Sequence, residues 1–273
     1  MSEDWWKEIN QSQKWRDGFF LFLCGAYGVI SIAALVQLIR IQIRVPNYGW
    51  TTQKVFHVMN FIFNGARSIV FGLYIPVFLL KPMVLTIVIL DFPAAIFFST
   101  CTLLVLFWAE IYHQVNYLET DKLRIYYISI NVGVYFIQFC FWIYIWQNDN
   151  AAVVFAGKIF ISAVSFLAAV GFAVYGGKMF FMLKSFHVES KGRGKKLREV
   201  GSITAICFTC FFAKSIVECV GAVVDGASLK TLDYPVLNLI YYTLTELIPS
   251  AFILLILSKL PPKRVSAQYQ LIR

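Results

Sequence analysis

Four polar side chains inside one long apolar run could form a binding site within a membrane. They are His57, Asn60, Asn64 and Arg67. Their spacing of three, four and three residues places all four on one face of a helix. An ionisable group in a bilayer is costly and needs a partner, so this face indicates a ligand, ion or proton site, or a polar network that holds helices together.

Acidic partners for Arg67 occur in two other apolar runs. Asp91 lies two residues before Pro93, and Glu246 follows Asn238, Tyr242 and Thr245 on much the same helical face. With a rise of about 1.5 Å per residue, Arg67, Asp91 and Glu246 all lie within about one turn of the middle of a bilayer. We expect Arg67 to be neutralised by Asp91, by Glu246 or by both.

Two further polar features follow from spacing along single helices. Lys214 and Glu218 are four residues apart, a separation at which they could pair within their own helix. Pro93 and Pro249 each remove one backbone hydrogen bond, which leaves an acceptor carbonyl near Asp91 and near Glu246.

The candidate polar core combines these side chains from three runs. Its members are Asn60, Asn64, Arg67, Asp91, Asn238, Tyr242 and Glu246. A structural network is the preferred interpretation, because nothing in the sequence identifies a substrate. A binding site for a small molecule or lipid is the alternative, and it predicts an activity that is lost in variants that still assemble.

A row of small residues occupies one face of the fifth apolar run. Ser165, Ala169, Ala173 and Gly177 recur at steps of four residues, and such rows let a second helix approach closely. We expect this face to pack within the bundle, with a dimer seam as the second interpretation.

The elements that must position these groups are seven apolar runs, each long enough to cross a bilayer as a helix. They are Phe19–Ile39, His57–Leu80, Met83–Phe107, Ile125–Trp146, Val153–Leu183, Ser202–Val224 and Pro235–Leu257. The composition agrees, with 59% hydrophobic and 14% charged residues in 273. We predict an all-α polytopic membrane protein: an N-terminal segment 1–18, a seven-helix domain 19–257 and a tail 258–273.

The distribution of Lys and Arg predicts an orientation for seven spans. The N-terminus and even-numbered connectors carry five, namely Lys7, Lys14, Arg16, Lys81 and Lys230. The other side carries fifteen, within Arg40–Lys54, Lys122–Arg124, Lys184–Arg198 and Lys259–Arg273. Basic connectors face the cytosol, so the N-terminus is expected to be lumenal or outside and the tail cytosolic. The basic side would meet anionic lipids or a protein partner, with no direct nucleic-acid binding.

Residues for catalysis or metal binding do not form known patterns. No phosphate-binding loop, G-x-S-x-G nucleophile or H-E-x-x-H zinc motif occurs in the chain. The six cysteines all fall inside apolar runs, where small polarizable packing residues are the preferred interpretation. We therefore expect a protein that is not an enzyme and has no cofactor and no metal.

Several long strings of the sequence are distinctive, namely Ala34–Gln42, Val45–His57, Glu199–Cys210, LLVLFWAEIYHQ at 103–114 and LPPKRVSAQY at 260–269. Together they resemble the plant tobamovirus multiplication protein family. The resemblance runs from about Asp4 to Tyr269. It implies a seven-span protein of the vacuolar membrane (tonoplast), a host factor that tethers tobamovirus replication proteins to the membrane where viral RNA is copied. It further implies an Arf-like small GTPase as a partner.

A replication protein that arrives from the cytosol would meet the basic side of the bundle. The candidate partner surface consists of Lys191, Arg193, Lys195, Lys196, Arg198, Lys263 and Arg264. The leading interpretation is a membrane scaffold, alone or in a homo- or hetero-oligomer. The alternatives are a receptor-like sensor of a small molecule or lipid in the polar core and, after it, a transporter.

Overall fold

The computed structural model describes residues 12–44, 52–147, 151–185, 191–223 and 235–257, and every regular element in these ranges is a helix. The predicted all-helical class is confirmed for this part of the chain. In order, the helices are α2 (Gln13–Arg44), α3 (Thr52–Gly72), α4 (Tyr74–Phe78), α5 (Met83–Val115), α6 (Asp121–Gln147), α7 (Ala151–Gly171), η1 (Phe172–Gly176), α8 (Gly177–Ser185), α9 (Lys191–Val223), α10 (Pro235–Tyr242), η2 (Thr243–Leu247) and α11 (Ile248–Leu257). The two η segments are single π-helical turns that join neighbouring α-helices.

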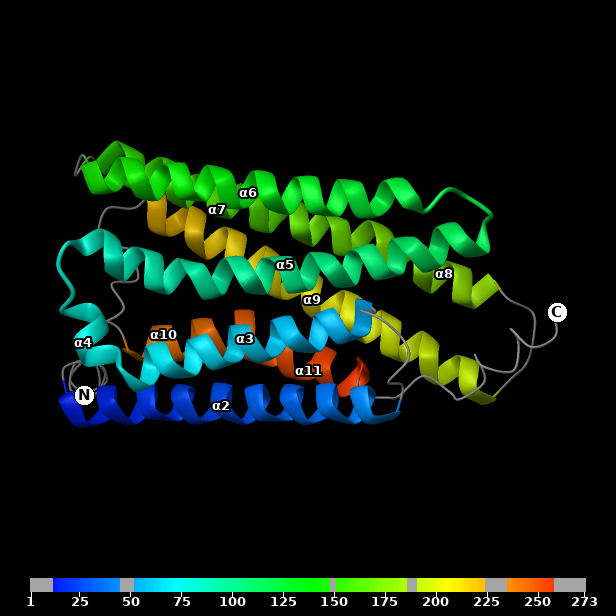
Figure 1. The fold of residues 1–273 in the computed structure, drawn as a ribbon, viewed down its shortest axis with the longest axis horizontal. Coiled ribbons are helices and arrows are strands. Elements are labelled where there is room, and N and C mark those ends of the chain that lie inside the picture. Colours follow the sequence, from blue (N-terminus) through cyan, green and yellow to red (C-terminus); the bar gives the residue numbers. More distant parts are fainter. Residues whose placement is uncertain (1–11, 45–51, 148–150, 186–190, 224–234, 258–273) are drawn as a thin grey trace, which may run out of the picture.

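The long helices run side by side along the longest axis of the molecule (Figure 1). Around the bundle, α2 packs against α3, α3 against α5, α5 against α6 and α6 against α7. Next, α7 packs against α9, and α9 against α11. The last helix closes the ring, because α10 returns to α2 and α11 to α3. The consequence is that α3 is enclosed by α2, α5 and α11.

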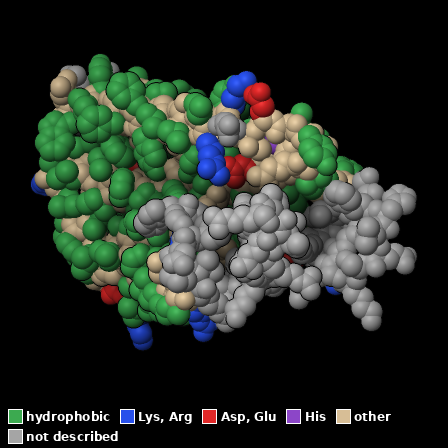
Figure 2. All heavy atoms as spheres, turned by 45° about the vertical axis from the view of Figure 1, so that its right-hand side comes forward, with side chains coloured by type: hydrophobic (Ala, Val, Ile, Leu, Met, Phe, Trp, Pro, Cys, Tyr) green, Lys and Arg blue, Asp and Glu red, His purple; other side chains and the backbone are tan. Residues whose placement is uncertain are grey.

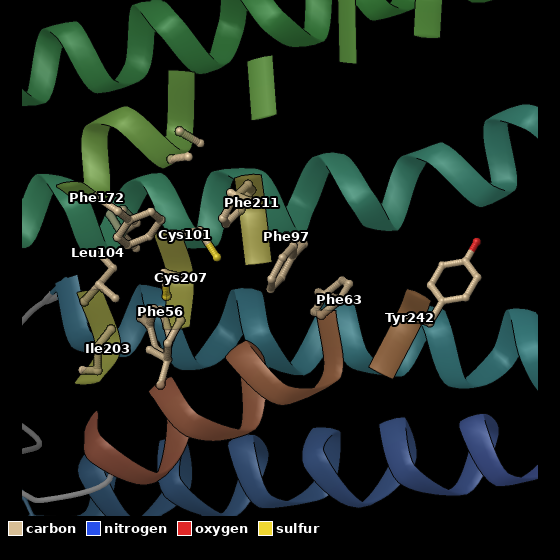
Figure 3. Packing of buried hydrophobic residues seen from close by; sticks show 14 of the residues in the cluster. Phe56, Phe63, Phe97, Cys101, Leu104, Phe172, Ile203, Cys207, Phe211 and Tyr242 are labelled. Carbon is tan, nitrogen blue, oxygen red and sulfur yellow. The ribbon is translucent and has the colours of Figure 1, made fainter. Parts of the chain in front are cut away.

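Aromatic side chains fill the centre of the bundle (Figure 3). Phe63 of α3 lies 4.8 Å from Phe97 of α5, between ring centroids, and Phe97 stacks on Phe211 of α9 at 5.6 Å. Phe211 continues to Phe172 in η1 at 5.8 Å. This row of rings connects four segments that are far apart in the sequence and fixes how they pack.

The outer surface of the bundle is apolar. Figure 2 shows hydrophobic side chains over a large part of one flank. On α6, Ile125, Ile128, Val132 and Phe136 are all more than half exposed. Soluble proteins rarely expose a continuous apolar surface of this extent to water, whereas such a surface is stable in contact with lipid. Among the described residues, six helices are long and apolar enough to cross a membrane, within Gln13–Ile43, Val84–Val115, Lys122–Gln147, Ala152–Met182, Arg198–Val223 and Pro235–Leu255. The chain is thus a multi-pass membrane protein.

The seventh expected span, α3, is not among those six helices. Its polar residues lower its hydropathy, but they point inward: His57, Asn60, Asn64 and Arg67 are at most 2% exposed. The residues it turns outward include Ile62 and Ile69, at 45% and 63% exposure. A hydropathy averaged over the whole helix cannot distinguish the buried polar face from the exposed apolar face. The count of seven spans therefore stays a prediction, and the apolar outer face of α3 supports it.

The span predicted from His57 to Leu80 is interrupted. The α3 helix ends at Gly72, a turn follows at Leu73, and the short α4 ends at Phe78. Pro76 explains the break, because it has no backbone N–H to donate to the carbonyl of Gly72 and its ring crowds that carbonyl.

The segment expected to connect the fifth and sixth spans is largely helical. The structure has α9 beginning at Lys191, eleven residues before the predicted start at Ser202. Lysine and arginine are good helix formers, so a helix can continue past the apolar run that crosses the membrane. Sequence hydropathy marks the end of the lipid-facing segment rather than the end of the helix. Likewise, α5 continues past the end predicted at Phe107 and ends at Val115.

The row of small residues leaves the packing face as it passes along the helix. Ser165 and Ala169 are buried, at 4% and 1% exposure, as a packing face requires. A step of four residues turns the direction by about 400°, so the row moves around the helix by about 40° at each step, and Ala173 is exposed whereas Gly176 is buried. The glycine in close contact with a neighbouring helix is thus Gly176, and the expected Gly177 has nothing within 4 Å of where a Cβ would lie.

Candidate functional site

The buried centre of the bundle is an ion pair between α3 and the last helix. Arg67 donates from Nε to Glu246 Oε2 and from Nη2 to Oε1, each at 2.7 Å. The two side chains are 2% and 0% exposed. A bidentate pair with this geometry is the arrangement that best compensates the desolvation of two buried charges. Of the two carboxylates expected near Arg67, Glu246 is the partner.

Further polar contacts surround this ion pair. Lys214 Nζ of α9 lies 3.3 Å from Glu246 Oε1, and Tyr27 OH of α2 donates to Oε2 at 3.3 Å. Arg67 Nη1 donates to the carbonyl of Leu90 at 2.9 Å, and the guanidinium carbon lies 4.9 Å from the centre of the Tyr242 ring. One carboxylate therefore serves two buried cations and a hydroxyl, and it joins α2, α3 and α9 to the last helix.

A distortion of the last helix supports this arrangement. Glu246 lies in the π turn η2, and Pro249 follows shortly after it. The proline cannot donate to the carbonyl of Thr245, and π turns are common where a helix must absorb such a break. Carbonyls in and beside this turn accept side-chain donors: Leu244 from Cys210 Sγ at 3.0 Å, and Tyr242 from Tyr27 OH at 3.4 Å.

The asparagines of α3 form a second polar layer. Asn64 Nδ2 donates to Ser250 Oγ of α11 at 3.0 Å, and Ser250 Oγ donates to Asn60 Oδ1 at 3.0 Å. Both asparagines also bond to α3 carbonyls one turn back. This layer is satisfied from within the bundle, which suits a structural role. Asn238 is buried in α10, about two turns before Glu246.

Asp91 does not form an ion pair with Arg67. Its Oδ2 accepts from Gln138 Nε2 at 3.0 Å and from Trp142 Nε1 at 3.2 Å, both on α6. Asp91 faces α6, while Arg67 reaches the backbone of α5 one residue earlier, at Leu90. Depth alone cannot distinguish these directions, because consecutive residues of a helix point about 100° apart.

The pairing expected between Lys214 and Glu218 is also wrong. Lys214 turns to Glu246, and Glu218 Oε1 accepts instead from Tyr241 OH at 2.9 Å. The attraction between a lysine and a carboxylate is stronger when both groups are shielded from water than when they form a partly solvated pair on one helix. The sequence marked Lys214 as a charge within a span, whereas no pattern marked Tyr27, Gln138 or Trp142.

A cavity of about 800 Å³ opens beside the ion pair, between α5, α6, α7, α9 and the last helix. The ion-pair residues Arg67, Lys214 and Glu246 line it, together with Asp91 and Glu218. Lys81 and Lys158 also line it, near the ends of α5 and α7 that lie on the same side as α4. Apolar and aromatic side chains form most of the rest, including Phe98, Phe141, Trp142 and Tyr241. Of the candidate polar core, Arg67, Asp91, Tyr242 and Glu246 reach this cavity.

The predicted partner surface is described only in part. Lys191, Arg193, Lys195, Lys196 and Arg198 belong to the first eight residues of α9, and Arg198 is exposed. Lys263 and Arg264 lie outside the described residues. Figure 1 shows the beginning of α9 extending past the ends of α3 and α11, on the side opposite α4.

In the described ranges, no three His, Cys, Asp or Glu side chains come together as metal ligands would. All six cysteines are free thiols, and Cys101 and Cys207 are fully buried in the aromatic core. The predicted packing role describes these two well.

Comparison with known proteins identifies the family. The THH1/TOM1/TOM3 domain matches residues 1–273. The chain is 63% identical over 266 residues to tobamovirus multiplication protein 1 of Nicotiana tabacum, covering 97% of this chain and 92% of the relative. It is 62% identical to the Arabidopsis thaliana protein of the same name, over 97% and 91%. It is 49% identical to Arabidopsis thaliana tobamovirus multiplication protein 3, over 100% and 90%. No solved structure matches. The resemblance seen in the sequence is thus confirmed, and the chain belongs to the THH1/TOM1/TOM3 family.

Proposed function

We propose that this protein is a host factor that anchors tobamovirus replication proteins to the vacuolar membrane. Relatives that share about three fifths of its residues along nearly their whole length are named for tobamovirus multiplication. The proposed role is that of a non-enzymatic scaffold, with seven spans counting α3, a lumenal N-terminus and a cytosolic tail. An Arf-like small GTPase is a proposed second partner at the same membrane.

One structural observation carries the proposal of a docking surface. The first eight residues of α9 are helical and contain five lysines and arginines, and the apolar run of the sequence begins only at Ser202. Under the proposed orientation this basic helical extension projects into the cytosol. A preformed helix presents its charges at fixed spacing, which favours recognition of an acidic protein surface over simple attraction to lipid.

The proposal predicts a loss of binding when the charge of this extension is reversed. Lys195→Glu together with Lys196→Glu is expected to reduce capture of a tobamovirus replication protein at least about tenfold, because charge complementarity becomes repulsion. The measurement is pull-down from membranes that contain the tagged, correctly inserted protein.

The matched control reverses two lysines at the other end of the bundle, Lys14→Glu with Lys81→Glu, which changes the net charge equally. This control is expected to bind like the wild type. Equal capture by both double variants would exclude the beginning of α9 as the docking surface.

A further inference from the structure

We propose that the cavity between α5, α6, α7 and α9 binds a small amphiphilic molecule that carries a protonated amine. The proposal goes beyond the scaffold role, because it assigns a ligand to the interior of the bundle. It rests on two carboxylates that line the cavity, Asp91 and Glu218, and on the aromatic side chains beside them.

Two carboxylates in the cavity wall have no cation of their own. Asp91 is held by the neutral donors Gln138 and Trp142, and Glu218 by the hydroxyl of Tyr241. In the described part of the chain, neither belongs to an ion pair. A carboxylate facing a mostly apolar cavity in a membrane is stabilised by a nearby positive charge. The hydrogen bonds to these two groups come from neutral donors.

The cations of the cavity have other partners or are solvated. Arg67 and Lys214 both form ion pairs with Glu246. Lys158 Nζ donates to the carbonyl of Gly221 at 3.2 Å, near the C-terminal end of α9, where a helix attracts positive charge. Lys81 is exposed. In the described part of the chain, none of these four cations forms an ion pair with Asp91 or Glu218.

The cavity also suits the body of such a ligand. Its volume of about 800 Å³ is ample for a drug-sized molecule. Trp142 lies beside Asp91, and Tyr241 lies beside Glu218. Aromatic rings next to a carboxylate stabilise an ammonium group by cation–π contact as well as by charge. An amine between Asp91 and Glu218 would point its apolar part toward walls such as Phe98 and Phe141.

The access route follows from the position of the cavity along the bundle. Lys81 lies just before α5 begins, at the end of the bundle that carries α4, and Asp91 lies about two turns into α5. A ligand would thus enter at the end opposite the basic beginning of α9. The ligand and a docked protein would occupy opposite ends of one bundle.

Three probes with a shared indole ring test the proposal on the purified full-length chain in detergent. Tryptamine carries the amine, indole-3-ethanol is neutral and indole-3-propionate is anionic. Calorimetric titration is expected to detect tryptamine binding, with affinity at least about tenfold above that of the other two, since a single well-placed charge contact is enough for a factor of this size. Tryptamine should also raise the unfolding temperature.

Two near-isosteric variants locate the binding site. Asp91→Asn and Glu218→Gln are each expected to lower tryptamine affinity about tenfold or more. Both variants should fold, because each keeps an oxygen that accepts the same hydrogen bonds. Glu110→Gln is the matched control, since Glu110 pairs with Arg124 away from the cavity, and it should bind like the wild type.

Each contrary result overturns the proposal. Equal binding of all three probes would make the cavity a nonspecific apolar site. Preference for indole-3-propionate would make it an anion site that uses Lys81 and Lys158. No binding of tryptamine to the folded wild type, or unchanged binding in both variants, would exclude the assigned carboxylates.

Discussion

Glu246→Gln is expected to destabilise the bundle by about 3–5 kcal/mol, more than any other single change in the central cluster, because it leaves buried cations without their carboxylate. Arg67 and Lys214 are 2% and 6% exposed, and both are turned to this one side chain. Glutamine has almost the same shape, so the loss comes from charge rather than from packing. Thermal unfolding of the purified protein in detergent, followed by intrinsic fluorescence, measures the change.

Variants of the other charged residues in the cluster should lose stability in a defined order. Lys214→Met leaves the bidentate Arg67–Glu246 pair complete and balanced, so we expect a change within about 1 kcal/mol, as for many exchanges of a buried charge for an apolar group. Arg67→Leu should fall between the two variants, because Lys214 can still neutralise Glu246. The double variant Glu246→Gln with Lys214→Met should be more stable than Glu246→Gln alone. A larger loss for Lys214→Met than for Glu246→Gln would contradict this description of the cluster.

Gly176→Ala is expected to cost about 1–3 kcal/mol or more through overpacking against α9. A Cβ at this position would lie 2.3 Å from Thr204 Oγ1, 2.6 Å from its Cγ2 and 2.9 Å from its Cβ. Rotation of the threonine side chain moves the first two atoms but not the third, so the helices themselves must separate. The measurement is again the unfolding temperature, together with the fraction of monodisperse protein recovered from membranes.

The adjacent glycine provides a close control. Gly177→Ala meets nothing within 4 Å, and alanine is favoured over glycine inside a helix by roughly 0.5–1 kcal/mol, so this variant should be as stable as the wild type or more so. Thr204→Gly should restore part of the stability lost in Gly176→Ala, because it removes all three atoms of the clash. Equal effects of alanine at positions 176 and 177 would exclude the close contact described for η1.

The two proposed sites are separable by experiment. Charge reversal at the beginning of α9 concerns protein binding at one end of the bundle, and Asp91→Asn concerns a cavity toward the other end. If a ligand in the cavity altered protein docking, the two binding events would have to influence each other reciprocally. Capture of the replication protein with and without tryptamine would measure that coupling.

The sequence alone was enough to predict that the helices lie in lipid, to indicate the family and to predict that the main polar face points into the bundle. Apolar runs of this length form helices in lipid, because every backbone polar group must be satisfied within its own segment. The spacing from His57 to Arg67 predicted a single face, and all four residues are buried in the bundle. These properties depend on the chain's own composition and on the helical period, so a one-dimensional pattern is enough to reveal them.

Only the tertiary structure decided which groups meet. Arg67 pairs with Glu246 rather than Asp91, and Lys214 leaves its neighbour Glu218 for the same carboxylate. A row of small residues at steps of four drifts around its helix, and the close contact lies at Gly176 rather than at the expected Gly177. The reason is geometric: a helical period gives the relative directions of side chains on one helix. The order of helices around the bundle and the rotation of each about its own axis arise only when all of them pack together.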